Sequence, residues 1–183
     1  MAGLAKEKQE LYTVDHIFAL PDGERAELID GVLYDMAPPA RGHQRLLFEL
    51  ATVINNYIES HGGDYEVDIA PFAVFLDDSN MNYVEPDISV ICDKSKLDDE
   101  GCHGAPDWVI EIVSPSSFRM DYIIKLYKYE EVGVRFYWIV DLQREIVRVY
   151  DFEHEDTMDY TFEEETPSGL YEDLLIKVGE LLG

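Results

Sequence analysis

Two nearly continuous apolar runs constrain the fold of this chain more than any other feature of its sequence. They span 107–113 and 135–141, and each is apolar on both faces of the pleat, a pattern typical of a central strand covered by helices. Between them, Ser116 or Ser117 can cap a helix that extends to about Val132 and is followed by a glycine. A strand, a helix and a second strand in this order predict a right-handed parallel crossover.

The segments on either side of this unit predict the remaining elements of a mixed sheet. Apolar residues recur at helical spacing from His43 to about Ser60, and Asp30-Gly31 joins two short runs into a hairpin. A short helix is expected at 13–20, strands at 65–76, 88–92, 145–152 and around 160–162, a charged loop at 93–106 and a C-terminal piece at 174–182. We therefore predict an α/β (α+β) fold in which a mixed β-sheet is flanked by helices. Its core order is helix, three strands, helix and strand, with extra strands at both ends.

Length and charge limit what the chain can be. A length of 183 residues suits one hydrophobic core, so 12–183 are predicted to form a single domain after a flexible lead at 1–11. The formal net charge of −25 favours cation binding and should repel DNA or an anionic membrane unless basic groups cluster locally. The candidates for such a cluster are Arg41 with Arg45, or Arg119 with Lys125 and Lys128.

The N-terminal residues and the cysteines indicate an intracellular protein. Residues 1–10 are polar and lack the apolar centre of a secretory signal, and no apolar run approaches the length of a membrane span. Cys92 and Cys102 are expected to be reduced thiols, because so few cysteines are typical of a cytosolic chain. We therefore expect a soluble, cytoplasmic protein with no membrane partner.

Glu111 is an acid inside one of the two apolar runs. It shares a face of the predicted strand with Val109 and Val113, and an unpaired charge in such a place is costly unless it binds a metal or an ionic partner. A partly exposed end of the strand is the alternative explanation. Glu111 is therefore a candidate site residue on the strength of its surroundings.

Asp87 and Lys125 are the other two candidates. Asp87 follows Pro86 directly before a predicted strand, a position that also suits ordinary turn chemistry. Lys125 lies four residues after Asp121 on the predicted helix, where a solvated ion pair is the simplest explanation. Neither residue points to a function by itself.

Considered together, these residues predict a cation site for phosphodiester hydrolysis. Asp87 begins one strand and Glu111 lies in the C-terminal part of the next apolar strand, so a hairpin-like arrangement brings both carboxylates to one end of the sheet. With the main-chain carbonyl of Ile112 they supply hard oxygen ligands suited to Mg²⁺ or Mn²⁺. The ammonium of Lys125, about two turns into the following helix, can orient or deprotonate the attacking water and offset phosphoryl charge.

The combination of motifs resembles the Uma-two type of putative restriction endonuclease, a branch of the PD-(D/E)XK nuclease superfamily. The residues that carry the resemblance are Pro86-Asp87, Glu111-Ile-Val-Ser-Pro-Ser116, Asp121-x-x-x-Lys125 and Gly133-Val-x-x-Tyr-Trp138-Ile-Val-Asp141, with Glu27-Leu-Ile-Asp-Gly31 and His43-Gln44.

This resemblance implies a restriction-endonuclease-like αβββαβ core and a metal-dependent endonuclease acting on DNA. It implies catalytic roles for Asp87 and Glu111, and it departs from the superfamily at the lysine, which normally stands two residues after the second acid. Val113 occupies that position here, so the resemblance implies that Lys125 takes the role from the following helix.

Three further residues are possible supporting members of the site. Glu27 adds a third carboxylate from the predicted hairpin, although a single charge beside a glycine turn also suits the surface. His43 can contact a phosphate or serve only near the start of its helix, and Asp121 precedes Lys125 by one helical turn.

Two alternatives to a DNA endonuclease fit the same sequence. The first is an acidic interaction or regulatory module that keeps a nuclease-like fold without activity, and the second is a phosphoesterase with a smaller substrate, which would tolerate the negative surface better. Apolar groups on the terminal hairpins also allow a homodimer.

Overall fold

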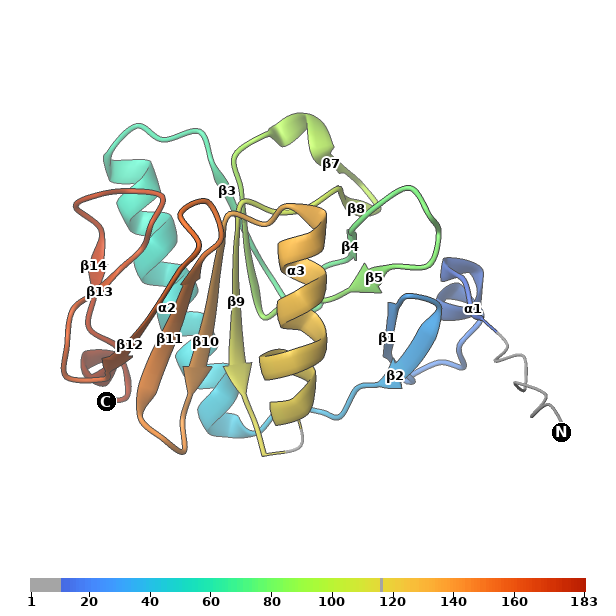
Figure 1. The fold of residues 1–183 in the computed structure, drawn as a ribbon, viewed down its shortest axis with the longest axis horizontal. Helices are drawn as coiled ribbons and strands as arrows, with labels where there is room; N and C mark the ends of the chain where they lie inside the picture. The colour runs from blue at the N-terminus through green and yellow to red at the C-terminus, as the bar shows by residue number, and fades with distance from the viewer. Residues whose placement is uncertain (1–10, 116) are drawn as a thin grey trace, which may run out of the picture.

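The described residues form two six-stranded β-sheets and a two-stranded one, and helices lie on both faces of the sheet that contains β9 and β10 (Figure 1). The computed structural model describes residues 11–115 and 117–183. The predicted flexible lead falls mainly on residues 1–10, which lie outside the described residues, and so does Ser116, one of the two predicted helix caps. The division into a lead and a single domain stays a prediction.

The main sheet contains the strands that the sequence singled out. Its order is β12-β11-β10-β9-β6-β3, and β9 and β10 are parallel while the other neighbours are antiparallel. The bounds are β3 Glu66–Ile69, β6 Ile88–Ile91, β9 Trp108–Val113, β10 Phe136–Asp141, β11 Ile146–Asp151 and β12 Asp156–Thr161. The predicted parallel strand–helix–strand unit and the mixed sheet are confirmed.

A second sheet covers one side of this layer, in the order β2-β1-β5-β4-β8-β7. Its strands are β1 Ala26–Ile29, β2 Val32–Asp35, β4 Val74–Phe75, β5 Tyr83–Val84, β7 Leu97–Asp98 and β8 Gly101–His103. The β1–β2 hairpin turns at Asp30 and Gly31, which have φ values of 51° and 74°. Positive φ at both turn positions is what the predicted Asp-Gly hairpin requires.

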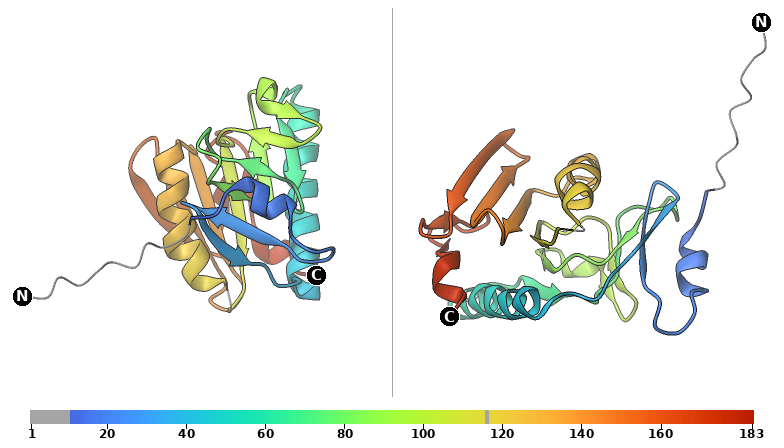
Figure 2. Two further views of the ribbon diagram at one scale, coloured as in Figure 1. Left: turned by 90° about the vertical axis from the view of Figure 1, so that its right-hand side faces the viewer. Right: turned by 90° about the horizontal axis from the view of Figure 1, so that it is seen from below.

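Helices α2 and α3 lie on opposite faces of the main sheet, as the view from below shows (Figure 2), whereas α1 lies beside β1. The helical elements are α1 Val14–Phe18, α2 Arg41–Ser60, the 3-10 turns η1 Lys94–Lys96 and η3 Val178–Leu181, the π-helix η2 Met120–Lys125 and α3 Leu126–Val132. Helix α3 ends at Gly133, whose φ of 88° suits a glycine after a helix. A short β13–β14 pair, Thr166–Pro167 with Leu175–Ile176, lies near the C-terminus.

Two of the three apolar clusters of the core lie on opposite faces of the main sheet, and the third lies between α1 and the second sheet. On one face, Trp108 and Ile110 of β9 pack with the apolar stripe of α2, including Leu46 and Leu50. On the other face, Val109 and Val113 pack in a second cluster with aromatic residues of α3 and β10. Within the residues described, no helix is long and apolar enough to cross a lipid bilayer.

Three predicted segments differ from the structure. The single strand at 65–76 is wrong, because β3 pairs with β6 in the main sheet whereas β4, after Pro71, pairs in the second sheet. Proline has no N–H for a ladder hydrogen bond, which favours a break there. The expected loop at 93–106 contains η1 and the β7–β8 pair. The helix after β9 begins with a π-helical segment, a form that is rare and frequent at functional sites.

Candidate functional site

Glu111 lies in the middle layer of the molecule with its carboxylate buried. It is 4% exposed on β9, so the alternative of a partly exposed strand end is wrong. One oxygen, Oε1, accepts hydrogen bonds from Lys125 Nζ at 2.7 Å and from the Tyr129 hydroxyl at 2.9 Å. Burial raises the pKa of Glu111 well above its usual value, and the opposing effect of the Lys125 charge does not cancel that rise.

Asp87 lies beside Glu111 because β6 and β9 are antiparallel neighbours. The register pairs Ile88 with Ile110, so the residue before β6 meets the C-terminal part of β9. Asp87 Oδ2 accepts a hydrogen bond from the Ile112 main-chain N–H at 2.8 Å, and the Asp87 N–H lies 3.5 Å from Glu111 Oε2. The two predicted acids therefore share one end of the sheet.

Lys125 reaches the acids from the π-helix, and its side chain is 5% exposed. Its Nζ lies 2.7 Å from Glu111 Oε1, 2.8 Å from Glu27 Oε1 and 4.0 Å from Asp121 Oδ1. The alternative of a solvated pair with Asp121 is therefore wrong. Burial lowers the pKa of Lys125, but the surrounding carboxylates outweigh burial and hold that pKa well above its usual value.

Glu27 belongs to the same cluster although it is far away in the sequence. It is 3% exposed on β1, so the alternative of a surface charge is wrong. Its Oε1 also accepts a hydrogen bond from the main-chain N–H of Glu85 at 3.0 Å. The second sheet therefore contributes one acid to a site whose other members belong to the main sheet and its helix.

His43 and Asp121 complete the cluster. His43, near the start of α2, places Nε2 2.9 Å from Asp87 Oδ2, while its Nδ1 is buried with no hydrogen-bond partner in the described part of the chain. Burial lowers the pKa of His43, yet the hydrogen bond and charge of Asp87 raise it above its usual value overall. Burial raises the pKa of Asp121 to about 6.

Tyr129 is a member of the site that the sequence did not single out. It is fully buried on α3 and donates to the same oxygen of Glu111 as Lys125 does. The signal was its position four residues after Lys125, which places both side chains on one face of a helix. With Oε1 held by two donors, Glu111 Oε2 is left facing the Asp87 N–H.

The donor set fits a hard divalent cation. Asp87 and Glu111 carry carboxylate oxygens and Ile112 a main-chain carbonyl, while three acids lie within 4.0 Å of Lys125 Nζ. No three His, Cys, Asp or Glu side chains in the described residues form a ready metal-binding group. Mg²⁺ does not require one, because it usually binds through one or two carboxylates and keeps several waters.

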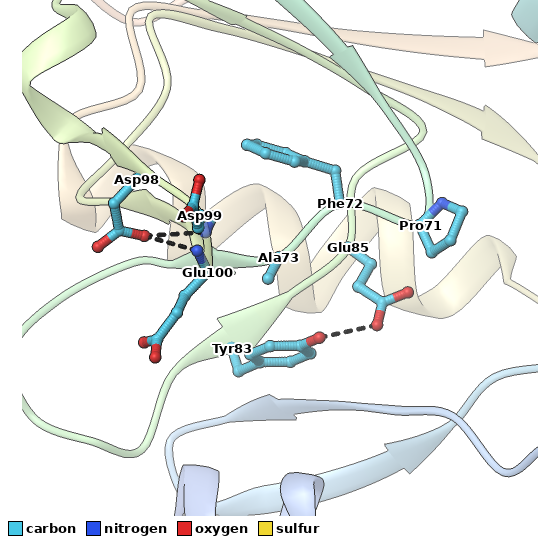
Figure 3. A pocket seen from close by; sticks show the side chains of 9 residues that line it. Pro71, Phe72, Ala73, Tyr83, Glu85, Asp98, Asp99 and Glu100 are labelled. Atoms are coloured by element: carbon cyan, nitrogen blue, oxygen red, sulfur yellow. Dashed lines mark hydrogen bonds between the residues drawn. The ribbon is translucent and has the colours of Figure 1, made fainter. Parts of the chain in front are cut away.

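A separate pocket of about 320 Å³ lies beside β5 and contains neither Asp87, Glu111 nor Lys125. Figure 3 shows Asp98, Asp99 and Glu100 on one side and Tyr83 with Glu85 on the other. This acidic lining disfavours a phosphate ligand. The pocket is therefore not a candidate for the hydrolytic site.

The sequence profile of a family described as "Putative restriction endonuclease", Uma2, matches residues 10–174. The chain belongs to the Uma2 family. This Uma2 chain is 30% identical over 98 residues to the uncharacterised protein slr1290 of Synechocystis sp. (strain ATCC 27184 / PCC 6803 / Kazusa). That match covers 54% of this chain and 50% of slr1290, so it spans about half the length of this relative.

A solved structure has the same fold as this Uma2 chain. It is a crystal structure from Anabaena variabilis ATCC 29413, described as a "putative nuclease belonging to DUF820", with a TM-score of 0.75 and 21% sequence identity. The match covers 93% of this chain and 97% of that one, which confirms the nuclease-like mixed α+β fold. The description of the family supports a nuclease-like function, and the neighbour supports the fold.

Proposed function

We propose that the chain is a metal-dependent endonuclease that hydrolyses phosphodiester bonds in DNA through Asp87, Glu111 and Lys125. The observation that carries the proposal is the buried Lys125 ammonium, which lies 2.7 Å from Glu111 on the strand beside Asp87. A charged cluster this deeply buried is costly for folding alone, and perturbed acids in a cluster of this kind are typical of functional sites.

Asp87, Glu111 and the carbonyl of Ile112 would hold Mg²⁺ or Mn²⁺. When bound, the ion supplies Lewis-acid stabilisation of phosphoryl oxygens and lowers the pKa of a water. The Asp87 carboxylate is held in place beside β9, because its Oδ2 accepts a hydrogen bond from the Ile112 main-chain N–H. Such fixed geometry is what a metal ligand requires from its supporting residues.

Lys125 acts as a positioned cation in this proposal. Glu111 and Glu27 both lie within 2.8 Å of Nζ, so the ammonium keeps its proton. A protonated lysine orients the attacking water and offsets charge that develops on the phosphoryl oxygens, and it does not serve as the base. Glu27 and Asp121 support the site by holding this ammonium in place.

His43 holds Asp87 from the other side. Its Nε2 contacts the same oxygen, Oδ2, that accepts the Ile112 N–H, which leaves the second oxygen of Asp87 for a cation. Tyr129 fixes Glu111 in the corresponding way through Oε1. Each carboxylate thus has one oxygen held by two donors, while Glu111 Oε2 has only the Asp87 N–H, at 3.5 Å.

Cleavage of single-stranded and duplex DNA with Mg²⁺ or Mn²⁺ tests the proposal. We expect activity in the parent chain and a loss of at least 100-fold in Asp87→Asn, Glu111→Gln and Lys125→Met, on the order expected for removal of a metal ligand or a charge-stabilising group. Glu131→Gln is the matched control, since Glu131 lies on α3 but is 68% exposed. Melting temperatures establish that each variant is folded.

The net charge of −25 favours one second candidate, a phosphoesterase with a smaller substrate. The test is hydrolysis of a small phosphodiester such as bis-p-nitrophenyl phosphate. If the chain hydrolyses it with the same dependence on Asp87 and Lys125 but does not cleave DNA, the substrate is a small phosphodiester and not DNA. Absence of hydrolysis of either substrate would favour the acidic interaction module. A homodimer is a further proposal, and sedimentation of the full chain tests it.

A further inference from the structure

The arginine side chains are unequally paired. Among the described residues, Arg41 and Arg119 are the arginines without a hydrogen bond or an ion pair, although the chain has 39 acidic residues. The paired arginines and their partners are Arg25 with Glu85, Arg45 with Glu49, Arg135 with Glu153, Arg144 with Asp141 and Arg148 with Asp159. In so acidic a protein, an exposed guanidinium without a partner is available for an external anion.

Both free arginines lie at the end of the molecule that carries the acid cluster. Arg41 begins α2, two residues before His43, whose imidazole contacts Asp87. Arg119 is exposed two residues before Asp121, where the chain enters the π-helix after β9. Figure 1 shows the start of α2, the end of β9 and the start of the following helix together at the lower end of the molecule.

Arg144 adds a third guanidinium at this end, in the turn between β10 and β11. Its guanidinium carbon lies 5.0 Å from the centre of the Phe118 ring and 5.7 Å from that of Tyr122. Packing on two rings fixes the plane of the guanidinium group, so its N–H donors lie in a defined plane. Its ion pair with Asp141 is long, at 3.8 Å, and the side chain is 53% exposed.

The other cations proposed for a basic cluster are not available to an anion. Lys125 and Lys128 are buried, and Lys128 Nζ is held between Asp30 and Glu131. Arg45 is paired with Glu49 on the same helix. The positive groups that can meet a phosphate near the acid cluster are therefore the three arginines.

We propose that Arg41, Arg119 and Arg144 form a rim that binds successive phosphates of a single nucleic-acid strand and leads it to the acid cluster. The proposal rests on the proposed nuclease function and names its substrate class as single-stranded or locally unpaired DNA. Guanidinium groups bind phosphate through paired N–H donors, and three of them suit one strand better than a duplex.

The surroundings of the rim favour an unpaired strand. Phe118 is 38% exposed beside Arg144, so its ring edge and Arg144 itself offer a surface on which an unpaired base can stack. The net charge of −25 opposes a second strand, which would bring further phosphates against the surrounding acids. An unpaired strand meets the rim with half the charge of a duplex.

Binding measured apart from cleavage tests the rim. Fluorescence anisotropy follows a labelled single-stranded oligonucleotide and a duplex of the same length, with the full chain carrying Asp87→Asn and a chelator present. The logarithm of the affinity should fall with the logarithm of salt concentration with a slope of about −2 for three contacts on a single strand. Each of Arg41→Gln, Arg119→Gln and Arg144→Gln should flatten that slope by about 0.7.

Arg135→Gln is the matched control, because Arg135 lies at the opposite end of β10 and is paired with Glu153. It should leave both affinity and slope unchanged. An equal loss in this control, unchanged slopes in the rim variants, or no binding by the parent would each overturn the rim. Tighter binding of the duplex would overturn the single-strand assignment.

The two proposals fail separately. If the chain binds the single strand through the three arginines but cleaves no DNA with Mg²⁺ or Mn²⁺, the arginine rim is supported and the nuclease proposal is refuted. If the parent and Arg144→Gln both cleave DNA with the same salt dependence, the nuclease proposal is supported and the arginine rim is refuted.

Discussion

Removal of the Tyr129 hydroxyl should weaken cation binding without dismantling the site. In Tyr129→Phe, Glu111 Oε1 loses the donor at 2.9 Å and keeps only Lys125 at 2.7 Å. A hydrogen bond to a charged group contributes about 1.5–3 kcal/mol, which corresponds to roughly 10–100-fold in an equilibrium constant. Loss of a residue that orients a metal ligand costs a similar factor, about 10–100-fold in metal affinity.

The assay is the cleavage rate as a function of Mg²⁺ concentration. We expect the Mg²⁺ concentration for half-maximal rate to rise by about 10–100-fold, while the rate at saturating Mg²⁺ falls much less. The shift should be larger at lower pH, because the lost donor raises the pKa of the Glu111 carboxyl further and protons then compete with the cation. A merely structural role of Tyr129 would lower stability without this selective shift.

Tyr137→Phe is the matched control. Tyr137 is as deeply buried as Tyr129 and also faces the acid cluster, but its hydroxyl donates to the main-chain carbonyl of Asp121 at 3.0 Å. It should lose stability and leave the Mg²⁺ dependence within about twofold of the parent, since it holds no proposed ligand. The reasoning is refuted if Tyr129→Phe shows the parent's Mg²⁺ dependence, or if both variants shift it equally.

Three further predictions concern stability in the absence of metal. Glu111→Gln should melt at or above the temperature of the parent at pH 7, because burial raises the pKa of that carboxyl and glutamine removes the cost of its charge; a clearly lower melting temperature would contradict this. Asp121 has a pKa of about 6 in the folded protein, which is above its unfolded value. Its protonated form therefore adds to the free energy of unfolding below about pH 4, and this stabilisation is lost as the pH rises through 6. The free energy of unfolding of the parent should decrease between pH 4 and pH 7, and Asp121→Asn should make that decrease smaller by about 3 kcal/mol. Chemical denaturation at the two pH values measures the difference. Lys125→Met should cost about 3–5 kcal/mol because it leaves Glu27 and Glu111 buried without their cation, and little or no change in the urea midpoint would show that the cluster is solvated.

The parts of the fold and site that depend on local pattern were predictable from the sequence. Continuous apolar strands on either side of a capped helix indicated the β9–β10 crossover, and alternation along β9 placed Glu111 on the face of Val109 and Val113. The antiparallel neighbour β6 then brought Asp87 to Ile112. These inferences needed only side-chain periodicity and strand order.

The parts that depend on long-range packing were not predictable. Glu27 joins the site only because the second sheet folds over the first, and no local pattern fixes that contact. The break at Pro71 sends β4 into the other sheet, a choice that depends on which edge is free. Tyr129 was recognisable as a helical neighbour of Lys125, but its contact with Glu111 depends on side-chain rotamers.

The position of Lys125 bears on the order in which folding and metal binding can occur. Proteins whose structural metal compensates buried ligands, such as zinc fingers, remain unfolded until that metal arrives. Here an ammonium carried by the chain itself lies among the acids at 2.7–2.8 Å and partly neutralises them. In the proposed enzyme, folding would therefore not require the metal, and protein made in a metal-starved cell would be folded and ready to bind a divalent ion once it is supplied.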